Sequence, residues 1–206
     1  MIKENNIHPT AVIYDGVIIG TGNTIGPYCV IGAPPEWKGK DNVSGHVIIG
    51  NNNTITGFAS IDSGIDNDNP TVIGDNCYIM KRAHLGHGAV LENNVTVSVG
   101  AILGGNAYLM EGVNFAINAI CHQYQTIGAY SMVGMGSVVT KKCKILPGEI
   151  HIGSPAKLLK INEVGLQRNN INPNNLKDLV EKYNKLLDEN LIKYDIHRGI
   201  DRENIG

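Results

Sequence analysis

The feature that most constrains this chain is a period of six residues that runs unbroken from Ile73 to Ile150. Each hexad begins with a residue that is not polar, and four places later it nearly always has a small one, with Gln125 as the exception. The thirteen hexads begin at Ile73, Ile79, Leu85, Leu91, Val97, Leu103, Leu109, Phe115, Cys121, Ile127, Val133, Val139 and Ile145. A helix has a period of 3.6 and a strand a period of two, so neither explains this pattern.

A hexapeptide period is typical of a parallel β-helix. Each hexad is expected to form one short strand and a turn, and three hexads close a coil of eighteen residues. The large apolar residue points inward, the small one fits the crowded corner, and successive coils lie about 4.7 to 4.9 Å apart. A β-sandwich is the alternative, but its turn signals would recur every 8 to 12 residues. The predicted fold class is therefore all-β, a parallel β-helix.

The rod is predicted to occupy residues 1–155, with extruded loops at 33–46 and 63–71. Prolines and polar residues break the pattern in both loops. Because Ile7, Ile49 and Ile73 are separated by multiples of six, each loop is expected to replace or insert whole hexads, so that the rod continues through it.

Residues 156–206 are predicted to form a C-terminal helical tail. From Pro173 the apolar residues follow a helical period. Asn172 suits the N-cap and Pro173 the first helical position, so the helix is expected to begin there.

Composition excludes several classes of function. The 206 residues carry a net charge of -2, and 17% of them are charged, with no basic stripe for nucleic acid. No apolar run approaches the roughly 18 residues of a membrane span, and the start lacks the apolar core of a signal peptide. A cytoplasmic protein is expected.

The four cysteines occupy inward positions of the repeat. Cys29, Cys77 and Cys143 fall at the small position, and Cys121 falls at the large one. They are expected to be buried apolar residues, not disulfide partners or metal ligands, because the chain has no C-x-x-C.

Outward polar residues indicate where chemistry takes place on such a rod. Hexads three apart share a face, so His87, Gly105, Asn106 and His122 are predicted to lie along one strip. Gly105 is eighteen residues after His87 and is expected directly above it. Imidazole suits a general base because its pKa of about 6.5 lies near working pH.

A metal site is the competing interpretation of these histidines. The segment from Gly86 to Leu91 resembles a ligand motif of the gamma-class carbonic anhydrases, which hold zinc on a similar rod. Where those proteins place a second histidine, this chain has Glu92. Acyl transfer without a metal is therefore favoured.

Four segments resemble the acyl-carrier-protein-dependent UDP-N-acetylglucosamine O-acyltransferase family of lipid A biosynthesis. They are Ile7-His8-Pro9-Thr10-Ala11, the run from Ile25 to Gly32, Ala83-His84-Leu85-Gly86-His87, and Val164-Gly165-Leu166-Gln167-Arg168. The resemblance implies a left-handed coil, although crossover connections are usually right-handed. It also implies a homotrimer with clefts between neighbouring rods.

The resemblance carries specific roles to matching positions. His87 matches the catalytic base that takes a proton from the sugar hydroxyl, and Gly105 matches the residue whose backbone N–H stabilises the oxyanion. His84, His122 and Gln123 match contacts to the nucleotide sugar. Asn106 stands on the same strip, in place of a family histidine, and is a candidate substrate contact.

Further positions match the two ends of the substrates. Asn162 and Arg168 match residues that bind the uridine diphosphate portion, and Glu36 and Lys38 fall in the loop that closes over the sugar. Met135 falls where long-chain enzymes have glycine, which suggests a shorter acyl group. The acyl donor is expected to be a thioester of acyl carrier protein, or acyl-CoA, with no metal and no further cofactor.

Two other functions fit the same residues. The segment Gly153-Ser154-Pro155-Ala156-Lys157 is also the ending of acetyl-CoA-dependent transferases, so a nucleotide-sugar N-acetyltransferase is one alternative. A noncatalytic β-helix that serves as a binding or assembly subunit is the other. The acceptor sugar, its attacked group and the acyl length stay open at this point.

Overall fold

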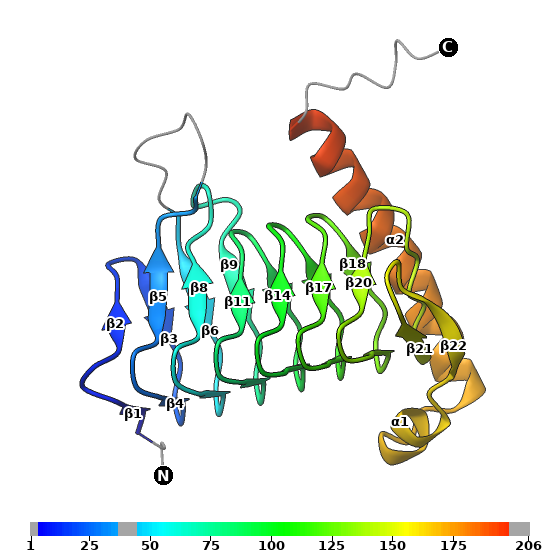
Figure 1. Ribbon diagram of the computed structural model, residues 1–206, viewed down its shortest axis with the longest axis horizontal. Coiled ribbons are helices and arrows are strands. Elements are labelled where there is room, and N and C mark those ends of the chain that lie inside the picture. The colour runs from blue at the N-terminus through cyan, green and yellow to red at the C-terminus, as the bar shows by residue number, and fades with distance from the viewer. Residues whose placement is uncertain (1–3, 37–44, 198–206) are drawn as a thin grey trace.

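A computed structural model of the chain describes residues 4–36 and 45–197. The chain winds into a rod whose coils are stacked along its length, with two helices at the C-terminal end (Figure 1). The strands form three sheets of nine, seven and six strands, named here sheets A, B and C. Apart from the last pair in sheet A, the neighbouring strands are parallel.

Each sheet takes one strand from each coil. Sheet A consists of β1 Asn6–Ile7, β4 Thr24–Ile25, β7 Thr54–Ile55, β10 Tyr78–Ile79, β13 Thr96–Val97, β16 Asn114–Phe115, β19 Met132–Val133, β21 Glu149–Ile152 and β22 Lys157–Ile161. Sheet B consists of β2 Val12–Ile13, β5 Val30–Ala33, β8 Ser60–Asp62, β11 His84–Leu85, β14 Ile102–Leu103, β17 Ile120–Cys121 and β20 Val138–Val139. Sheet C consists of β3 Val17–Ile19, β6 Val47–Ile49, β9 Thr71–Ile73, β12 Val90–Leu91, β15 Tyr108–Leu109 and β18 Thr126–Ile127.

The hexapeptide pattern forms the core as predicted. All thirteen large inward residues from Ile73 to Ile145 are at most 2% exposed. Partners in adjacent coils are eighteen residues apart, as in the pairing of Leu85 with Leu103 and of Leu103 with Cys121. Burial of this apolar row along the rod is the main stabilising contribution that the repeat supplies.

The two loops insert whole hexads, which confirms the predicted register. Val17 pairs with Val47, so the first loop adds 12 residues to the normal 18. Ser60 pairs with His84, a separation of 24, so the second loop adds 6. Both insertions leave the large residues inward, because a multiple of six preserves the face on which each side chain lies.

The C-terminal segment differs from its prediction at the start. The predicted helical tail begins with strand β22, Lys157–Ile161, which pairs antiparallel with β21. This strand occupies the edge that β21 would otherwise leave open, and the hexapeptide pattern has no place for it because the chain has reversed direction. Helix α1, Glu163–Arg168, follows, and helix α2, Pro173–His197, begins at the predicted residue.

Helix α2 packs on sheet C at β18. The Asn172 side chain accepts hydrogen bonds from the backbone N–H groups of Asn174 and Asn175, as expected for an N-cap. Tyr183 and Leu187 are buried against the rod. The apolar face predicted for this helix is therefore the face that contacts the protein.

The cysteines are free thiols, and three of the four are buried; Cys143 is partly buried. Burial raises the pKa of the Cys77 thiol to about 11. No helix in the described part of the chain has the length and apolar character that a membrane crossing requires.

Candidate functional site

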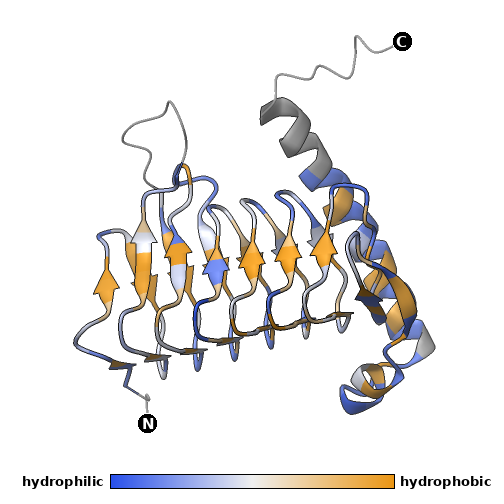
Figure 2. Cartoon of the chain, viewed as in Figure 1, coloured by the Kyte–Doolittle hydropathy of each residue, from blue (hydrophilic) through white to orange (hydrophobic). Residues whose placement is uncertain are grey.

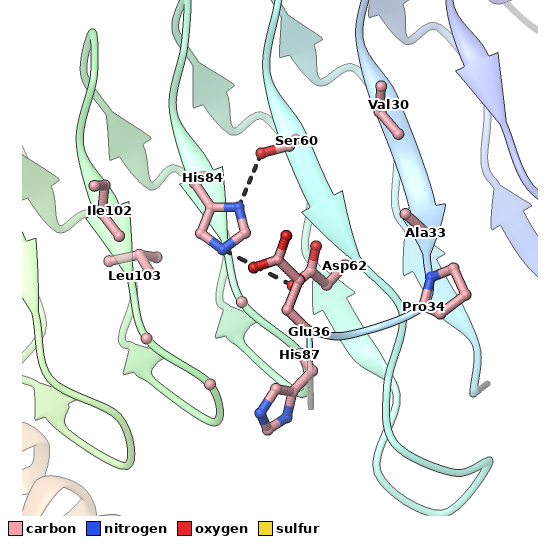
Figure 3. A pocket seen from close by; sticks show the side chains of 13 residues that line it. Val30, Ala33, Pro34, Glu36, Ser60, Asp62, His84, His87, Ile102 and Leu103 are labelled. Atoms are coloured by element: carbon pink, nitrogen blue, oxygen red, sulfur yellow. Dashed lines mark hydrogen bonds and ion pairs between the residues drawn. The ribbon is translucent and has the colours of Figure 1, made fainter. Parts of the chain in front are cut away.

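The candidate site is a pocket of about 680 Å³ on sheet B. It lies over β5, β8, β11 and β14, four neighbouring strands of that sheet (Figure 3). Its lining residues are Val30, Ala33, Pro34, Glu36, Ser60, Asp62, His84, Gly86, His87, Ile102, Leu103, Gly104 and Gly105. Four of the predicted site residues, Glu36, His84, His87 and Gly105, are therefore brought together in it.

Polar side chains interrupt an otherwise apolar face at this place. Strands β14, β17 and β20 show apolar colour on the visible face of the rod, whereas β8 and β11 are partly hydrophilic (Figure 2). The polar residues are Ser60 and Asp62 on β8 and His84 on β11. A polar group on a strand of an apolar face is a candidate for ligand contact.

His87 lies directly against Gly105, as the eighteen-residue spacing predicts. A Cβ atom added at Gly105 would be 2.6 Å from Cε1 of the His87 ring, so no side chain fits beside the imidazole. The backbone carbonyl of His87 accepts a hydrogen bond of 2.7 Å from the backbone N–H of Asn106. This bond fixes the turn of His87 onto the turn of Gly105.

Gly105 lines the pocket with its backbone. Within the described residues its N–H donates no hydrogen bond to another backbone group, while the Gly105 carbonyl accepts one of 2.9 Å from Tyr124. A fixed N–H donor beside an imidazole is the arrangement that acyl transfer requires, because negative charge develops on the carbonyl oxygen while a proton is removed nearby.

His84 is held by two neighbours on β8. Its Nδ1 is 2.8 Å from the Ser60 hydroxyl, and its Nε2 is 3.8 Å from Oδ2 of Asp62. Figure 3 shows the ring directed at both groups, with Glu36 in the same region of the pocket. Burial raises the pKa of the Asp62 carboxyl, His84 partly offsets this, and the negative charge of Glu36 raises the pKa further.

Ser60 and Asp62 are pocket residues that the sequence pattern does not predict. Counting in units of eighteen from His84 leads to residue 66, which lies in the second loop. The signal that would have found them is the single hexad that this loop inserts, since 24 residues back from His84 is Ser60. Asp62 then follows two places later, on the same outward face as Ser60.

Three predicted contacts lie on the strip but do not line this pocket in the described structure. Asn106 is buried and adopts a left-handed turn conformation with φ of 57°. His122 is one coil beyond Gly105, and its Nδ1 lies 2.9 Å from the Gln123 carbonyl. The roles assigned to Asn106, His122 and Gln123 stay predictions.

The residues predicted to bind the diphosphate are at the C-terminal end of the rod. Asn162 is the N-cap of α1, where it accepts a bond from the Gly165 N–H and donates one of 2.8 Å to the Tyr130 carbonyl. Arg168 is exposed in the last turn of α1, which lies beyond β20 and away from the pocket (Figure 1). One chain therefore does not bring these two residues to His87.

Met135 is the residue predicted to meet the acyl end, and Glu36 and Lys38 are those predicted in the sugar loop. Met135 is 72% exposed at the turn between β19 and β20, so its side chain is free to meet a ligand or another subunit. Lys38 lies outside the described residues, whereas Glu36, two places earlier, lines the pocket.

Glu92, which replaces a histidine of the carbonic anhydrase motif, has a structural role here. Its carboxylate accepts bonds from the Tyr108 hydroxyl at 2.7 Å and from the Lys182 ammonium at 2.6 Å. Tyr108 belongs to the rod and Lys182 to α2, so Glu92 links the helix to sheet C. The described residues contain no group of three or more histidines, cysteines and carboxylates arranged to hold a metal ion.

The chain is similar to known transferases. Residues 70–105 match the family described as bacterial transferase hexapeptide (six repeats). An acyl-[acyl-carrier-protein]–UDP-N-acetylglucosamine O-acyltransferase of Campylobacter lari is 35% identical over 202 residues, covering 80% of this chain and 76% of the relative. A Burkholderia lata relative of the same name is 32% identical, covering 86% and 67%.

The matched region covers a smaller share of a third relative's length. With the Synechocystis protein of the same name it shares 32% identity over 80% of this chain but only 59% of that protein. Among solved structures, a UDP-N-acetylglucosamine acyltransferase from Bacteroides fragilis superimposes with a TM-score of 0.77 at 28% identity, covering 88% of this chain and 70% of the other. These likenesses confirm the predicted fold class, a left-handed parallel β-helix with a C-terminal helical segment.

Proposed function

Because the chain belongs to the acyl-[acyl-carrier-protein]–UDP-N-acetylglucosamine O-acyltransferase family, we propose that it moves an acyl group from acyl carrier protein to a UDP-amino-sugar such as UDP-N-acetylglucosamine. The reaction would serve lipid A biosynthesis. His87 is the general base, Gly105 the oxyanion donor, and no covalent enzyme intermediate forms.

The chemistry follows from the two groups at the pocket. His87 takes the proton from the sugar hydroxyl as its oxygen attacks the thioester carbonyl carbon. The carbon–oxygen bond forms, and the Gly105 N–H stabilises the negative oxygen of the tetrahedral intermediate. When the carbon–sulfur bond breaks, the imidazolium returns the proton to the departing thiolate. Neither a metal nor a redox group takes part in these steps.

The observation that carries this proposal is the contact between the His87 ring and Gly105. The two residues stand on adjacent coils of one pocket, where a Cβ at position 105 would meet the imidazole at 2.6 Å. A base and an oxyanion donor must both lie within about 3 Å of the reacting group, so proximity of this kind is a geometric requirement of the mechanism.

An apolar path from the pocket supports the acyl end of the proposal. Ile102 lines the pocket and is 41% exposed, and Ile120, its partner on the next coil, is 42% exposed. One coil further, the exposed Met135 side chain stands at the corner of the rod. An acyl chain that follows this path would end at Met135, which suits a shorter chain than a glycine there would accept.

We also propose a cytoplasmic homotrimer. Exposed apolar residues on sheet B favour contact with another copy of the chain. A neighbouring subunit would also place its Asn162 and Arg168 beside the pocket of His87. Within one chain these residues lie far from that pocket. Arginine suits this role because its guanidinium makes charge-assisted hydrogen bonds to phosphate.

Replacement of His87 tests the function directly. We expect His87→Ala to lower kcat by about 100- to 10,000-fold with acyl carrier protein thioester and UDP-N-acetylglucosamine, because general base catalysis contributes that much. The variant should keep the oligomeric state of the wild type. His8→Ala, which removes an exposed histidine from the first coil, is the matched control. Near-wild-type turnover by His87→Ala would refute the assignment.

A further inference from the structure

We propose that Asp62 binds the sugar of the acceptor, and that His84 acts through Asp62 by orienting it. This inference rests on the proposed function and assigns the sugar end of the acceptor to one face of the pocket. The observations that carry it are the contacts of His84, the environment of the Asp62 carboxylate, and the charges beside them.

The ring of His84 is held in place by the protein through Nδ1. An imidazole has two nitrogens, and each can make one hydrogen bond. Here Nδ1 meets the Ser60 hydroxyl at 2.8 Å, and Nε2 is directed at Asp62 Oδ2 at 3.8 Å. Ser60 thus holds the ring through Nδ1, and Nε2 lies beside the Asp62 carboxylate, where it can position that group.

The Asp62 carboxylate lines the pocket and can accept further hydrogen bonds. Its side chain is 15% exposed, less than half of the 37% of His84. Among the described residues His84 is its one ion-pair partner, and no hydrogen bond to its two oxygens is present. A carboxylate offers about four lone-pair positions, and because this side chain is partly exposed in the pocket, a ligand donor can reach it.

The chemistry of the ligand group follows. A carboxylate only accepts hydrogen bonds, so the group that meets Asp62 must donate one, as a sugar hydroxyl or an amide N–H does. Glu36 lines the same pocket and adds a second negative charge. A diphosphate would be repelled at this place, so the sugar ring lies over β8 and β11 and the diphosphate lies away from them.

Asp62 also has the right position relative to the base. Ser60 and Asp62 lie on β8, one coil before His84 on β11, and the following turn carries His87. A ring held at Asp62 therefore reaches toward His87 across one coil spacing of about 4.7 to 4.9 Å. This distance is about the width of a pyranose ring.

The test measures binding of UDP-N-acetylglucosamine and of UDP alone to full-length protein by isothermal titration calorimetry. Asp62→Asn keeps the shape of the side chain and removes its charge. We expect this variant to bind UDP-N-acetylglucosamine about 10- to 100-fold more weakly, the value of a hydrogen bond to a charged group, and to bind UDP as the wild type does. Asp15→Asn, at an exposed carboxylate, is the control for loss of one negative charge.

A double-mutant cycle then separates the two histidine roles. The affinities of Asp62→Asn, of His84→Ala and of the double variant are compared. If His84 acts through Asp62, the double variant should lose no more affinity than the weaker-binding of the two single variants. Additive losses would show that His84 contacts the ligand by itself and would overturn the inference. Equal weakening of UDP and UDP-N-acetylglucosamine by Asp62→Asn, or no weakening of either, would overturn it as well.

The same titration distinguishes failure of the inference from failure of the proposed function. Wild-type protein that binds UDP-N-acetylglucosamine, with an Asp62→Asn variant that binds it equally well, contradicts the inference alone. Wild-type protein that binds neither nucleotide and transfers no acyl group contradicts the proposed function, and the inference falls with it.

Discussion

At Gly105 the missing side chain is as important as the imidazole next to it. A methyl group at this position would lie 2.6 Å from Cε1 and 3.0 Å from Cδ2 of His87. We expect Gly105→Ala to displace the ring and to lower kcat about 100-fold, because a shift of about 1 Å in a catalytic group has that effect. Steady-state kinetics, with circular dichroism to verify the fold, measures this change.

Gly136→Ala is the control for Gly105→Ala. Gly136 has φ of +65° and nothing within 4 Å of an added Cβ, so alanine there introduces backbone strain without a new contact. We expect it to cost about 1 kcal/mol of stability and to leave kcat unchanged. Equal kcat values for Gly105→Ala and the wild type would show that the His87 ring does not depend on this gap.

The Asp62 carboxyl is expected to make the protein less stable at neutral pH than an amide would. Burial, opposed by His84 and reinforced by Glu36, raises its pKa in the folded state. A raised pKa contributes stability below the unfolded value near 3.8, and this contribution is lost as the pH rises through the folded value. Asparagine does not ionise, so Asp62→Asn should raise the thermal midpoint at pH 7.

This gain should shrink as the pH falls toward 4, where the wild-type carboxyl becomes neutral as well. Thermal unfolding of both proteins between pH 4 and 7 provides the comparison. A midpoint that Asp62→Asn lowers at pH 7 would mean that the ion pair with His84 outweighs burial. A stabilised variant that binds the acceptor poorly would indicate that Asp62 serves function at the expense of stability.

The two parts of the pocket differ in how far the sequence predicts them. The stacking of His87 on Gly105 follows from a fixed spacing of eighteen, so the repeat alone was sufficient. Asp62 stands before an inserted hexad, which changes the spacing to its neighbour on the next coil to 24. The number of hexads in a loop depends on where the chain re-enters the rod, and local composition does not determine this.

At the scale of the turn, asparagines replace the small inward residues of two hexads. Asn23 and Asn53 are 0% and 1% exposed. Each amide oxygen accepts a bond from a backbone N–H of the next coil: Asn23 from Asn53 at 2.8 Å, and Asn53 from Cys77 at 2.7 Å. Their amide nitrogens donate to the carbonyls of Gly50 and Gly74. The side chains thus extend the hydrogen bonding of the sheets around a corner.

We expect Asn53→Ala to destabilise the rod by about 2 to 4 kcal/mol. The change leaves a buried N–H at Cys77 and a carbonyl at Gly74 without this partner, and each lost bond costs about 1 to 3 kcal/mol. Urea unfolding measures the difference. Asn67→Ala, in an exposed part of the second loop, should change stability by no more than about 0.5 kcal/mol.

If both asparagine variants had the same stability, the side-chain bonds at the corner would contribute nothing net to folding. The sequence did not predict this role. The inward pattern distinguishes large from small positions, and a buried amide is compatible with the small position only because its backbone partners lie on the adjacent coil. Those partners are known only once the coils are stacked.

At the scale of the molecule, the repeat predicts the rod well and its C-terminal end poorly. The register from Ile7 to Ile145 follows from a single period, whereas β22 and the packing of α2 on β18 depend on tertiary contacts that have no period. The same limit applies to the predicted diphosphate residues. Asn162 caps α1 and Arg168 ends it, far along the rod from the pocket, so the role proposed for them requires a second chain.

The exposed apolar face of sheet B is expected to be the subunit interface. Val12, Ile102 and Ile120 are 50%, 41% and 42% exposed on sheet B, and a face of this kind gains free energy when another subunit covers it. We expect the wild type to elute as a trimer with light-scattering detection. Ile120→Glu should dissociate it at micromolar concentration, because an unpaired carboxylate would be buried at the interface.

The matched control is Tyr78→Glu, which places the same charge at a residue 41% exposed on sheet A. Because Ile120 also stands on the proposed acyl path, UDP affinity is the readout of dissociation: Ile120→Glu should remove it, since Arg168 would no longer lie beside the pocket of a neighbouring chain. A wild-type monomer with full activity would contradict both steps: sheet B would then be the exposed face of a complete enzyme, and the diphosphate would have to bind to residues of the same rod.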